Sequence, residues 1–308
     1  MSASTGARTL PTWLTAAERA RGASLLRDYA ALTRPRVLAL VLFTAPPALV
    51  LGPGRWPAAA LCLGVLLGTA LIGAGCGALN AWLEQDVDAR MLRTCDRPLP
   101  SGRLEPRQAL QFGLAISLLG LLCLHAVGGW LPTLIGAATL FHYVVVYTLW
   151  LKPRSPQNIV IGGAAGAAAP LIADAAVDGR LGVFGIALFA IVFLWTPPHF
   201  WAIALYRKRE YAAAGIPMMP AVVGDDGTRW RMLCYALALV PTSLVPWLLG
   251  ALSGVYAAVA LALGAGFALS IVRAIRARCP RGDRRVFLVS LVYLAGLFAA
   301  MLVELPLP

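Results

Sequence analysis

The chain has 308 residues, of which 59% are hydrophobic and only 13% are charged, and its mean hydropathy is +0.76. A soluble domain cannot bury this much apolar surface, so the composition excludes an ordinary soluble protein and predicts a polytopic membrane protein. In a soluble protein the formal net charge of +12 would favour a nucleic-acid partner. Here the basic residues lie in short loops between apolar segments, so membrane topology explains the charge and we expect no nucleic-acid partner.

Residues 1–30 precede the apolar segments and lack the apolar core and small-residue cleavage site of a signal peptide. Their Arg and Ala content is faintly similar to that of a mitochondrial presequence, but Glu18 and Asp28 argue against one. We interpret this region as a short cytoplasmic arm, which an amphipathic helix would suit, and residues 31–308 as one membrane domain. The expected location is a bacterial plasma (inner) membrane.

Nine apolar segments follow, most of them near the ~20 residues that a helix needs to cross a ~30 Å hydrocarbon layer. They cover residues 37–52, 57–82, 108–127, 130–150, 158–175, 181–205, 232–250, 253–272 and 286–304. The first contains Pro46 and Pro47, and the fifth is rich in Gly and Ala, which favours close helix packing over lipid contact. The pattern predicts an all-α protein with nine transmembrane helices.

Lysine and arginine are distributed unevenly between the two sides of this arrangement. With the N-terminus inside, all 26 of them except Arg55 and Arg180 lie on the inner side. Because Lys and Arg accumulate in cytoplasmic loops, this bias predicts a cytoplasmic N-terminus. The two longest polar loops, the main candidates for an active site, are on the same side. Asp174 and Asp178 are expected to be solvated on the opposite side.

The first long loop begins with Asn80, Glu84 and Asp88, which are spaced i, i+4 and i+8. On a continuing helix they would share an arc of about 80° and lie about 6 Å apart along the axis. One amide and two carboxylates there form an oxygen-only surface, which suits Mg²⁺ with water and phosphate completing its shell. The sequence therefore predicts a metal site where the second span ends.

Arg93 and Arg97 follow in the same loop before Pro98 ends the expected helix. Guanidinium groups bind phosphate oxygens in pairs of hydrogen bonds, so arginines beside Mg²⁺ would suit a diphosphate. The alternative is a solvated helix end with ordinary ion pairs. Asn80 and Glu84 lie at the edge of an apolar span, where polar groups are costly, and this favours a catalytic role.

The second long loop follows the sixth span and places His199, Tyr206 and Glu210 on one helical face, with Lys208 adding positive charge. His199 lies deep in the apolar span. Two interpretations of this histidine stay open: a packed core residue bonded to a carbonyl, or a ligand or proton-handling group inside a cavity.

A third, shorter loop on the same side contains Lys152, Arg154 and Asn158. These residues can bind substrate, or they can reflect nothing more than the preference for positive charge on the inner side. His125 and His142 are expected to be structural.

Taken together, these segments resemble the UbiA-type intramembrane prenyltransferases. The segment NAWLEQDVDARMLRTCDRPLPSGR is similar to the first aspartate-rich motif of that family. The segments LTRPRVLAL, YTLWLKPRSPQNIVIGGAAGAAAPL and FLWTPPHFWAIALYRKREYAAAGIPMMPAVVG are more similar to the branch that farnesylates heme. The resemblance covers nearly the whole chain from about Thr33, and the combination of motifs is more specific than any one of them.

The resemblance implies nine helices around a central cavity that opens sideways to the lipid. It also implies Mg²⁺ as cofactor, farnesyl diphosphate as donor and heme B as acceptor. In the implied reaction the farnesyl group is joined to a heme vinyl group, water is added, and heme O and diphosphate are formed. A heme A synthase or a terminal oxidase under assembly would receive the product.

Carried over by position, the family's first motif falls on Asn80, Glu84 and Asp88, and Glu84 stands where many relatives have Asp. The second acidic motif falls on His199, Tyr206 and Glu210, where a single carboxylate remains, so a second metal site of the two-carboxylate kind is not implied. His199 distinguishes the chain from quinone prenyltransferases. It is interpreted as a heme-facing group, either an iron ligand or a residue that positions the acceptor.

Two rival functions would differ in recognisable ways. A prenyltransferase with a quinone or aromatic acceptor is expected to carry more acids between residues 199 and 210. A membrane heme carrier or transporter with an ion site at Glu84 and Asp88 is expected to have these charges nearer the bilayer midplane. The charges lie instead at the predicted cytoplasmic rim, where basic side chains can neutralise a diphosphate leaving group.

Overall fold

The structure is a computed structural model that describes residues 16–305, with side chains from residue 24 onward. All regular secondary structure in this range is helical. The first half of the chain contains α1 (Ala16–Leu32), α2 (Pro35–Phe43), α3 (Pro46–Leu51), α4 (Ala59–Leu83), α5 (Gln85–Ala89), α6 (Pro106–Gly128), α7 (Trp130–Phe141), the π-helix η1 (His142–Leu151), α8 (Asn158–Gly166) and α9 (Ala168–Asp178). The second half contains α10 (Val183–Tyr206), α11 (Lys208–Ala213), α12 (Met219–Ser243), α13 (Val245–Leu248), α14 (Gly254–Ala277) and α15 (Pro280–Glu304).

The described residues include eight helical segments that are long and apolar enough to cross a membrane. A ninth is obtained if the end of α1 and the α2–α3 segment, which meet at a bend of 49°, count as one span. The predicted all-α membrane fold is therefore confirmed, and the chain is an integral membrane protein. The division at residue 30 and the side on which the N-terminus lies stay predictions, and residues 1–15 of the predicted arm lie outside the described range.

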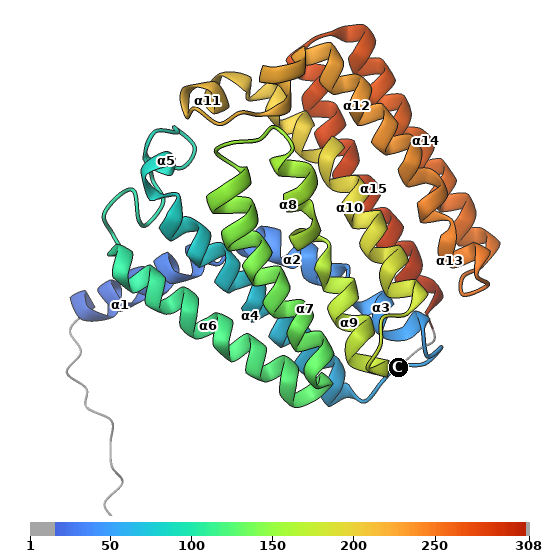
Figure 1. Cartoon of the computed structure of the whole chain (residues 1–308), viewed down its shortest axis with the longest axis horizontal. Helices are drawn as coiled ribbons and strands as arrows, with labels where there is room; N and C mark the ends of the chain where they lie inside the picture. The colour runs from blue at the N-terminus through green and yellow to red at the C-terminus, as the bar shows by residue number, and fades with distance from the viewer. Residues whose placement is uncertain (1–15, 306–308) are drawn as a thin grey trace, which may run out of the picture.

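The first predicted span is broken in the middle. α2 ends at Phe43, and α3 starts afresh at Pro46, because two successive prolines lack the N–H groups that a continuous helix requires. α3 is buried along most of its length and contacts α9, α10 and α15. Figure 1 shows the helices from α4 to α9 in one half of the molecule and α10 and α12 to α15 in the other, with α11 above the first half. The contacts of α3 with α9, α10 and α15 bridge the two halves.

Helices α4 and α6 pack closely because glycines replace side chains where the helices meet. A Cβ atom on Gly120 would lie 2.9 Å from the Ile72 nitrogen, and one on Gly75 would lie 2.0 Å from the Ser117 hydroxyl oxygen. Small residues at such crossings let backbones approach in a lipid environment, where apolar side chains gain little from leaving the lipid. The Gly- and Ala-rich fifth span behaves as predicted, since 72% of its apolar window is buried inside the protein.

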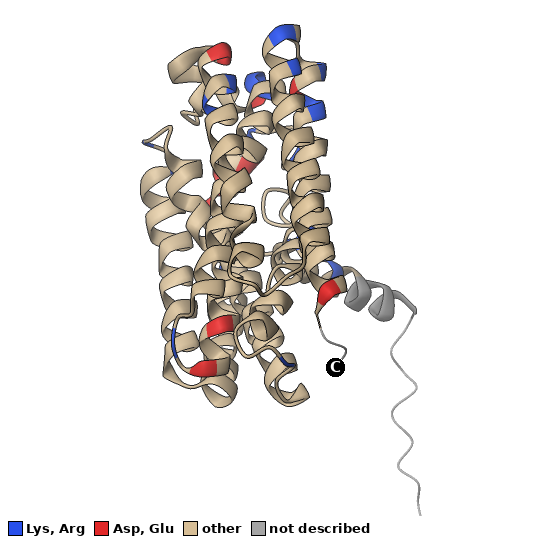
Figure 2. Ribbon diagram, turned by 90° about the vertical axis from the view of Figure 1, so that its right-hand side faces the viewer, with Lys and Arg blue, Asp and Glu red and all other residues tan. Residues whose placement is uncertain are grey.

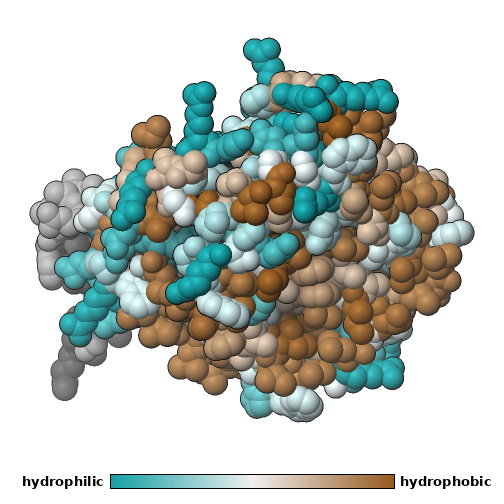
Figure 3. All heavy atoms as spheres, turned by 45° about the horizontal axis from the view of Figure 1, so that its top comes forward, coloured by the Kyte–Doolittle hydropathy of each residue, from teal (hydrophilic) through white to brown (hydrophobic). Residues whose placement is uncertain are grey.

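Charged residues gather at one end of the bundle. Figure 2 shows most Lys and Arg positions at the end that carries α11, and Figure 3 shows hydrophilic atoms over that end and hydrophobic atoms over the sides. The expectation for Asp174, at the opposite end, is wrong. This carboxylate is buried because its Oδ2 accepts a hydrogen bond from the Gly182 backbone N–H at 2.6 Å, whereas Asp178 is exposed as expected.

A buried ion pair ties α12 to α15 at the charged end. The Arg229 guanidinium donates two hydrogen bonds to the Asp283 carboxylate, with Nε–Oδ1 and Nη2–Oδ2 distances of 2.8 and 2.7 Å. It also reaches Asp226 at 3.0 Å, and the exposed Arg278 contacts the second oxygen of Asp226 at 3.0 Å. Each buried charge has a partner of opposite sign, which is the condition under which burial of charge is tolerated.

We predict that Asp283→Asn lowers the midpoint of thermal unfolding in detergent. The change removes the carboxylate that accepts two of the hydrogen bonds of the buried Arg229 and leaves it only the partly exposed Asp226. Breaking a buried pair costs up to about 3–5 kcal/mol. Arg278→Gln removes only the exposed contact of the same network and is expected to cost less than about 1 kcal/mol. Equal unfolding midpoints for Asp283→Asn and the parent protein would contradict this account.

Candidate functional site

The three residues of the first motif lie on one face although the helix bends between them. α4 ends at Leu83, and Glu84 leaves ideal helical geometry with φ −101° and ψ 9°. The i→i−4 bonding nevertheless continues, with the Glu84 N–H to the Asn80 carbonyl at 3.0 Å and the Asp88 N–H to the Glu84 carbonyl at 2.8 Å. The predicted face therefore survives as the junction of α4 and α5.

The expectation that this helix continues to Pro98 is wrong, because α5 ends at Ala89. The Thr94 hydroxyl donates to the Asp88 carbonyl at 2.8 Å and folds the chain back over the motif. A threonine hydroxyl competes in this way with helical bonding. The reversal brings Arg97, rather than Arg93, against the carboxylates, and Arg93 remains exposed.

Each polar group of the motif is buried and has a partner. Asn80, Glu84 and Asp88 are 0%, 7% and 5% exposed. The Asn80 amide donates to the Thr148 hydroxyl at 3.0 Å, Glu84 forms an ion pair with Lys152, and Asp88 Oδ2 accepts from Arg97 Nη1 at 2.6 Å. The structure thus assembles the first loop and Lys152 into one cluster.

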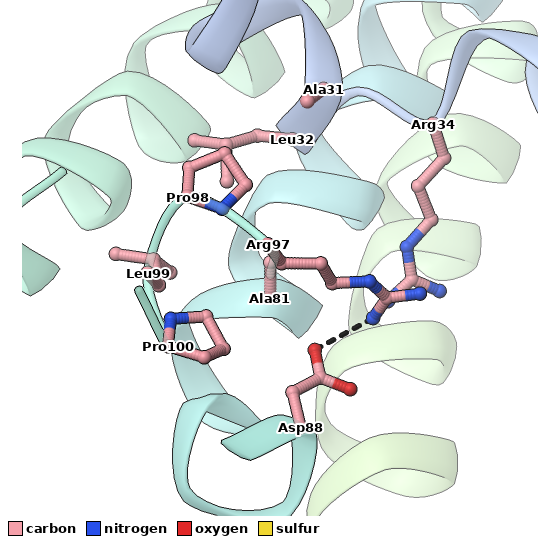
Figure 4. A pocket seen from close by; sticks show the side chains of 9 residues that line it. All are labelled: Ala31, Leu32, Arg34, Ala81, Asp88, Arg97, Pro98, Leu99 and Pro100. Atoms are coloured by element: carbon pink, nitrogen blue, oxygen red, sulfur yellow. Dashed lines mark hydrogen bonds and ion pairs between the residues drawn. The ribbon is translucent and has the colours of Figure 1, made fainter. Parts of the chain in front are cut away.

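Arg34 belongs to this cluster and is not among the residues expected from the sequence. Its guanidinium donates to Asn80 Oδ1. Figure 4 shows the guanidinium groups of Arg34 and Arg97 next to each other and facing Asp88. Arg34 has a left-handed backbone with φ 51° and ψ 58°, uncommon for a residue with a side chain, and Pro35 follows it. The segment Arg34-Pro35-Arg36 at the edge of an apolar segment was the available signal.

Two glycines on α4 allow the segment around Arg34 to approach. A Cβ atom on Gly77 would lie 2.8 Å from the Leu32 carbonyl oxygen, and one on Gly73 would lie 2.7 Å from Leu38 Cδ1. Because Gly77 has no side chain, the backbone turn between α1 and α2 can pack against α4 at this position. This close approach allows the Arg34 side chain to reach Asn80.

Two adjoining hollows lie on either side of Arg34. The smaller, of about 280 Å³, includes Asp88, Arg97 and Pro98, and Figure 4 shows these residues around it. The larger, of about 650 Å³, is lined almost entirely by apolar side chains of α2, α4, α7 and α9, together with Tyr143 of η1. Arg34 lines both. We call the smaller one the polar pocket after its three charged side chains, Arg34, Asp88 and Arg97, which lie among six apolar residues.

The π-helix η1 supplies the remaining wall. In a π-helix each backbone N–H bonds to the carbonyl five residues earlier, as the Lys152 N–H does to the Tyr147 carbonyl at 2.8 Å. The Thr148 hydroxyl also donates to the carbonyl five residues earlier, that of Tyr143, at 2.8 Å. Thr148 and Lys152 consequently both reach the motif on α4. The Tyr143 and Tyr147 rings stack at an angle with centroids 5.3 Å apart. Segments of π-helix are rare and are frequent at functional sites.

The cluster carries more positive charge than its carboxylates compensate. Burial lowers the pKa of the Arg97 guanidinium, and the charges of Arg34 and Arg93 lower it further, whereas Asp88 opposes the shift. Guanidinium groups that destabilise one another would be stabilised by an added anion between them. The site is therefore suited to bind a multiply charged anion.

Several other predicted site residues are not brought to this cluster. Arg154 donates to the Leu149 and Trp150 carbonyls at the end of its own helix. Asn158 is fully buried, and its amide donates to the Ser155 carbonyl at 2.6 Å.

In the second loop Lys208 pairs with Asp225 at 2.7 Å, and Glu210 pairs with Arg207 at 3.0 Å. The Tyr206 ring lies 6.0 Å from that of Phe287. Within the described residues, this loop makes no ion pair with the α4–α5 motif.

His199 lies in the interior of the helix pair α10–α15 and is 6% exposed. Its imidazole stacks on Trp195 with a centroid distance of 4.2 Å, and Nδ1 is 2.7 Å from the Ser290 hydroxyl. The carbonyl partner expected for a purely structural histidine is found instead for His142, whose Nε2 is 2.8 Å from the Ile161 oxygen.

Comparison with known proteins identifies the class to which this fold and site belong. Residues 41–300 match the model of the UbiA prenyltransferase family. The chain therefore belongs to the UbiA prenyltransferase family, which confirms the resemblance drawn from the motifs.

Its relatives point to one branch of that family. A protein of Mesorhizobium japonicum named protoheme IX farnesyltransferase 1 is 48% identical over 280 residues, which is 90% of this chain and 89% of that protein. A protoheme IX farnesyltransferase of Rhodopseudomonas palustris (strain BisB5) is 46% identical over 281 residues, or 90% of each chain. One of Erythrobacter litoralis is 44% identical over 90% of this chain and 92% of its own.

Solved structures share the fold at low sequence identity. A digeranylgeranylglyceryl phosphate synthase superposes with a TM-score of 0.77 at 15% identity, covering 91% of this chain and 98% of the other. A UbiA homolog from Archaeoglobus fulgidus bound to GPP and Mg²⁺ gives a TM-score of 0.62 at 19% identity, covering 89% and 99%.

We predict that Gly77→Ala weakens the binding of inorganic diphosphate by the purified protein. The added methyl group meets a backbone oxygen at 2.8 Å, so the turn that carries Arg34 has to move away from Asn80. Isothermal titration would measure the change. The control is Gly266→Ala on α14, where a Cβ atom meets nothing within 4 Å. Unchanged diphosphate affinity in Gly77→Ala would show that the position of Arg34 does not affect anion binding.

Proposed function

We propose that the chain transfers the farnesyl group of farnesyl diphosphate to a vinyl group of heme B, with addition of water, to give heme O and diphosphate. The observation that carries this proposal is the position of Arg34 between a basic polar pocket and a large apolar cavity. A prenyl diphosphate has the same two parts, a charged head and an apolar chain. The acceptor is assigned from the relatives, which are named protoheme IX farnesyltransferases.

The diphosphate is bound by the cations of the cluster. Arg97 and Lys152 neutralise Asp88 and Glu84, and Arg34 bonds to Asn80. We infer that these three cations turn to the diphosphate when it enters, since guanidinium groups form paired bonds with phosphate oxygens. Arg93, exposed at the entrance, adds to the attraction for the anion.

The donor set of the motif fits Mg²⁺, because Asn80, Glu84 and Asp88 offer only oxygen ligands. These three residues would hold the ion, with diphosphate oxygens and water completing its coordination. When bound, Mg²⁺ supplies charge stabilisation for the departing diphosphate. The A. fulgidus homolog bound to GPP and Mg²⁺ supports a divalent ion in this family.

The apolar cavity receives the farnesyl chain. It is lined mostly by apolar side chains of α2, α4, α8 and α9. As the bond between the farnesyl carbon and its oxygen breaks, Arg34, Arg97 and Lys152 stabilise the negative charge that develops on the diphosphate. Tyr143 lines the cavity, and its aromatic ring would stabilise positive charge on the farnesyl carbon. The apolar walls would keep water away until the vinyl group has attacked.

A vinyl acceptor is already nucleophilic and needs no general base. This agrees with a second motif (His199, Tyr206 and Glu210) in which the single carboxylate, Glu210, is paired with Arg207. We infer that His199 faces the heme and that Tyr206 and Lys208 line the approach from the charged end, while Arg154 and Asn158 support the loop that carries Lys152.

The proposed location is the plasma (inner) membrane of a bacterium, with the charged end and its polar pocket on the cytoplasmic side. Bacterial relatives and the excess of Lys and Arg at that end support this orientation. Farnesyl diphosphate would enter from the cytoplasm and heme from the bilayer. The product would pass to a heme A synthase or to a terminal oxidase under assembly.

We predict that Glu84→Gln and Asp88→Asn each reduce farnesyl transfer by at least about 100-fold, because each removes a charged ligand for the metal and the partner of a buried cation. Purified protein would be incubated with heme B, farnesyl diphosphate and Mg²⁺, and the heme mass followed for a gain of farnesyl plus water. Asp86→Asn, an exposed carboxylate of the same loop, is the matched control. Retained activity in both variants would refute the metal assignment.

We predict that Val41→Trp raises the KM for farnesyl diphosphate while dimethylallyl diphosphate is still used. Val41 is half-buried and lines the apolar cavity away from the motif, so the larger ring shortens the space for the chain and leaves the polar pocket intact. The ratio of kcat/KM for the two donors measures the effect. An equal loss of kcat/KM with both donors would show that the farnesyl chain does not occupy this cavity.

A further inference from the structure

We propose that Ser290 of α15 is a positioning residue, which holds His199 in the tautomer that carries its proton on Nδ1 and leaves the Nε2 lone pair free to bind the iron of the acceptor. The proposal rests on the proposed function, because the acceptor has to be a heme. It adds a residue on the last helix to a site otherwise built from α2, α4, η1 and α10.

The direction of the hydrogen bonds around Ser290 determines the tautomer. Ser290 is 0% exposed, and its hydroxyl lies 2.6 Å from the Phe287 carbonyl oxygen and 2.7 Å from His199 Nδ1. A carbonyl oxygen only accepts, so the single hydroxyl proton is committed to Phe287. The bond to the imidazole therefore has Nδ1–H as donor and the serine oxygen as acceptor. In a neutral imidazole the proton on Nδ1 leaves Nε2 unprotonated.

The same serine also fixes the orientation of the ring. Its backbone carbonyl accepts a hydrogen bond from Trp195 Nε1 at 2.7 Å, and the Trp195 indole stacks on the imidazole at 24° with centroids 4.2 Å apart. The Phe287 ring covers the imidazole from a centroid distance of 4.9 Å, and Phe200 meets it edge-on at 5.2 Å. Three aromatic rings and one hydroxyl thus hold the imidazole in one orientation.

His199 Nε2 has no hydrogen-bond partner among the residues that the structure describes. It is also not one of the fully buried polar atoms without a partner, which are Thr69 Oγ1, Asn158 Oδ1, Trp201 Nε1 and Tyr293 Oη in the described chain. The small exposed fraction of the residue is therefore consistent with an accessible Nε2. An accessible, oriented lone pair within the bundle is a binding group that the protein itself leaves unused.

The tautomer of His199 determines which chemical groups its Nε2 atom can bind. An unprotonated Nε2 cannot donate to a phosphate oxygen, so His199 is not part of the diphosphate site. Imidazole nitrogen is a suitable ligand for iron, and a histidine ligand commonly donates its other N–H to an oxygen that fixes its orientation. Ser290 supplies that oxygen. Loss of such a supporting group typically reduces metal affinity or activity by about 10- to 100-fold.

The tautomer can be measured without any substrate. The chain has 3 histidines, so His125→Gln with His142→Gln leaves His199 as the single imidazole. Nitrogen-15 NMR of this protein in nanodiscs is expected to show a protonated Nδ1 and an unprotonated Nε2, and Ser290→Ala is expected to shift the population toward Nε2–H. Ser270→Ala is the matched control, because Ser270 makes the same bond to the Phe267 carbonyl at 2.7 Å on α14. A protonated Nε2 in the protein with Ser290 overturns the proposal.

Heme binding then tests the role of the free nitrogen. In the otherwise unaltered protein, Ser290→Ala is expected to weaken heme B binding about 10- to 100-fold and to lose the iron–histidine band in resonance Raman spectra, with the KM for farnesyl diphosphate unchanged. Ser290→Thr, which keeps the hydroxyl, is expected to restore binding at least in part.

The outcomes separate this proposal from the proposed function. An unchanged iron–histidine band in Ser290→Ala overturns the positioning role and leaves the reaction intact. A parent protein that binds and farnesylates heme B without an iron–histidine band overturns the iron ligand alone. A parent protein that neither binds nor farnesylates heme B overturns the proposed function and, with it, the iron ligand.

Discussion

The requirement that buried charge be compensated governs the functional end of this protein. Asn80, Glu84 and Asp88 are removed from water at the edge of an apolar bundle, so each must have a partner of suitable charge or hydrogen-bonding character. The partners come from elements far apart in the sequence, among them Arg34 and Lys152. Charge compensation therefore brings together the segment that carries Arg34, the π-helix η1 and the first long loop.

The backbone irregularities of the fold follow from the same requirement. The left-handed conformation of Arg34, the close approach at Gly77 and the wide register of η1 each cost conformational or packing free energy. Each of them also brings a side chain to the motif that a regular helix would direct elsewhere. Strain of this kind persists where surrounding contacts over-determine it, and here those contacts are the ion pairs and hydrogen bonds of the motif.

In the proposed reaction the donor and the acceptor are held by different kinds of interaction. On the proposed donor side, Arg34 and Arg97 bring their positive charges together around Asn80 and Asp88. On the proposed acceptor side, His199 is held by stacking against Trp195 and by one neutral hydrogen bond from its Nδ1 to Ser290.

The sequence by itself determined the membrane class, the apolar segments and the residues of the first motif, because hydrophobicity and i, i+4 spacing are local properties that survive folding. It also indicated the family, through motifs spread along the chain. Only the tertiary structure decided that Arg34 and Lys152 join Glu84 while Arg154 and Glu210 do not, and that Ser290 contacts His199. Those pairs are separated by tens of residues, so their contacts depend on how the helices pack. The sequence spacing determines on which face of a helix a residue lies, whereas the packing of the helices determines which residues that face contacts.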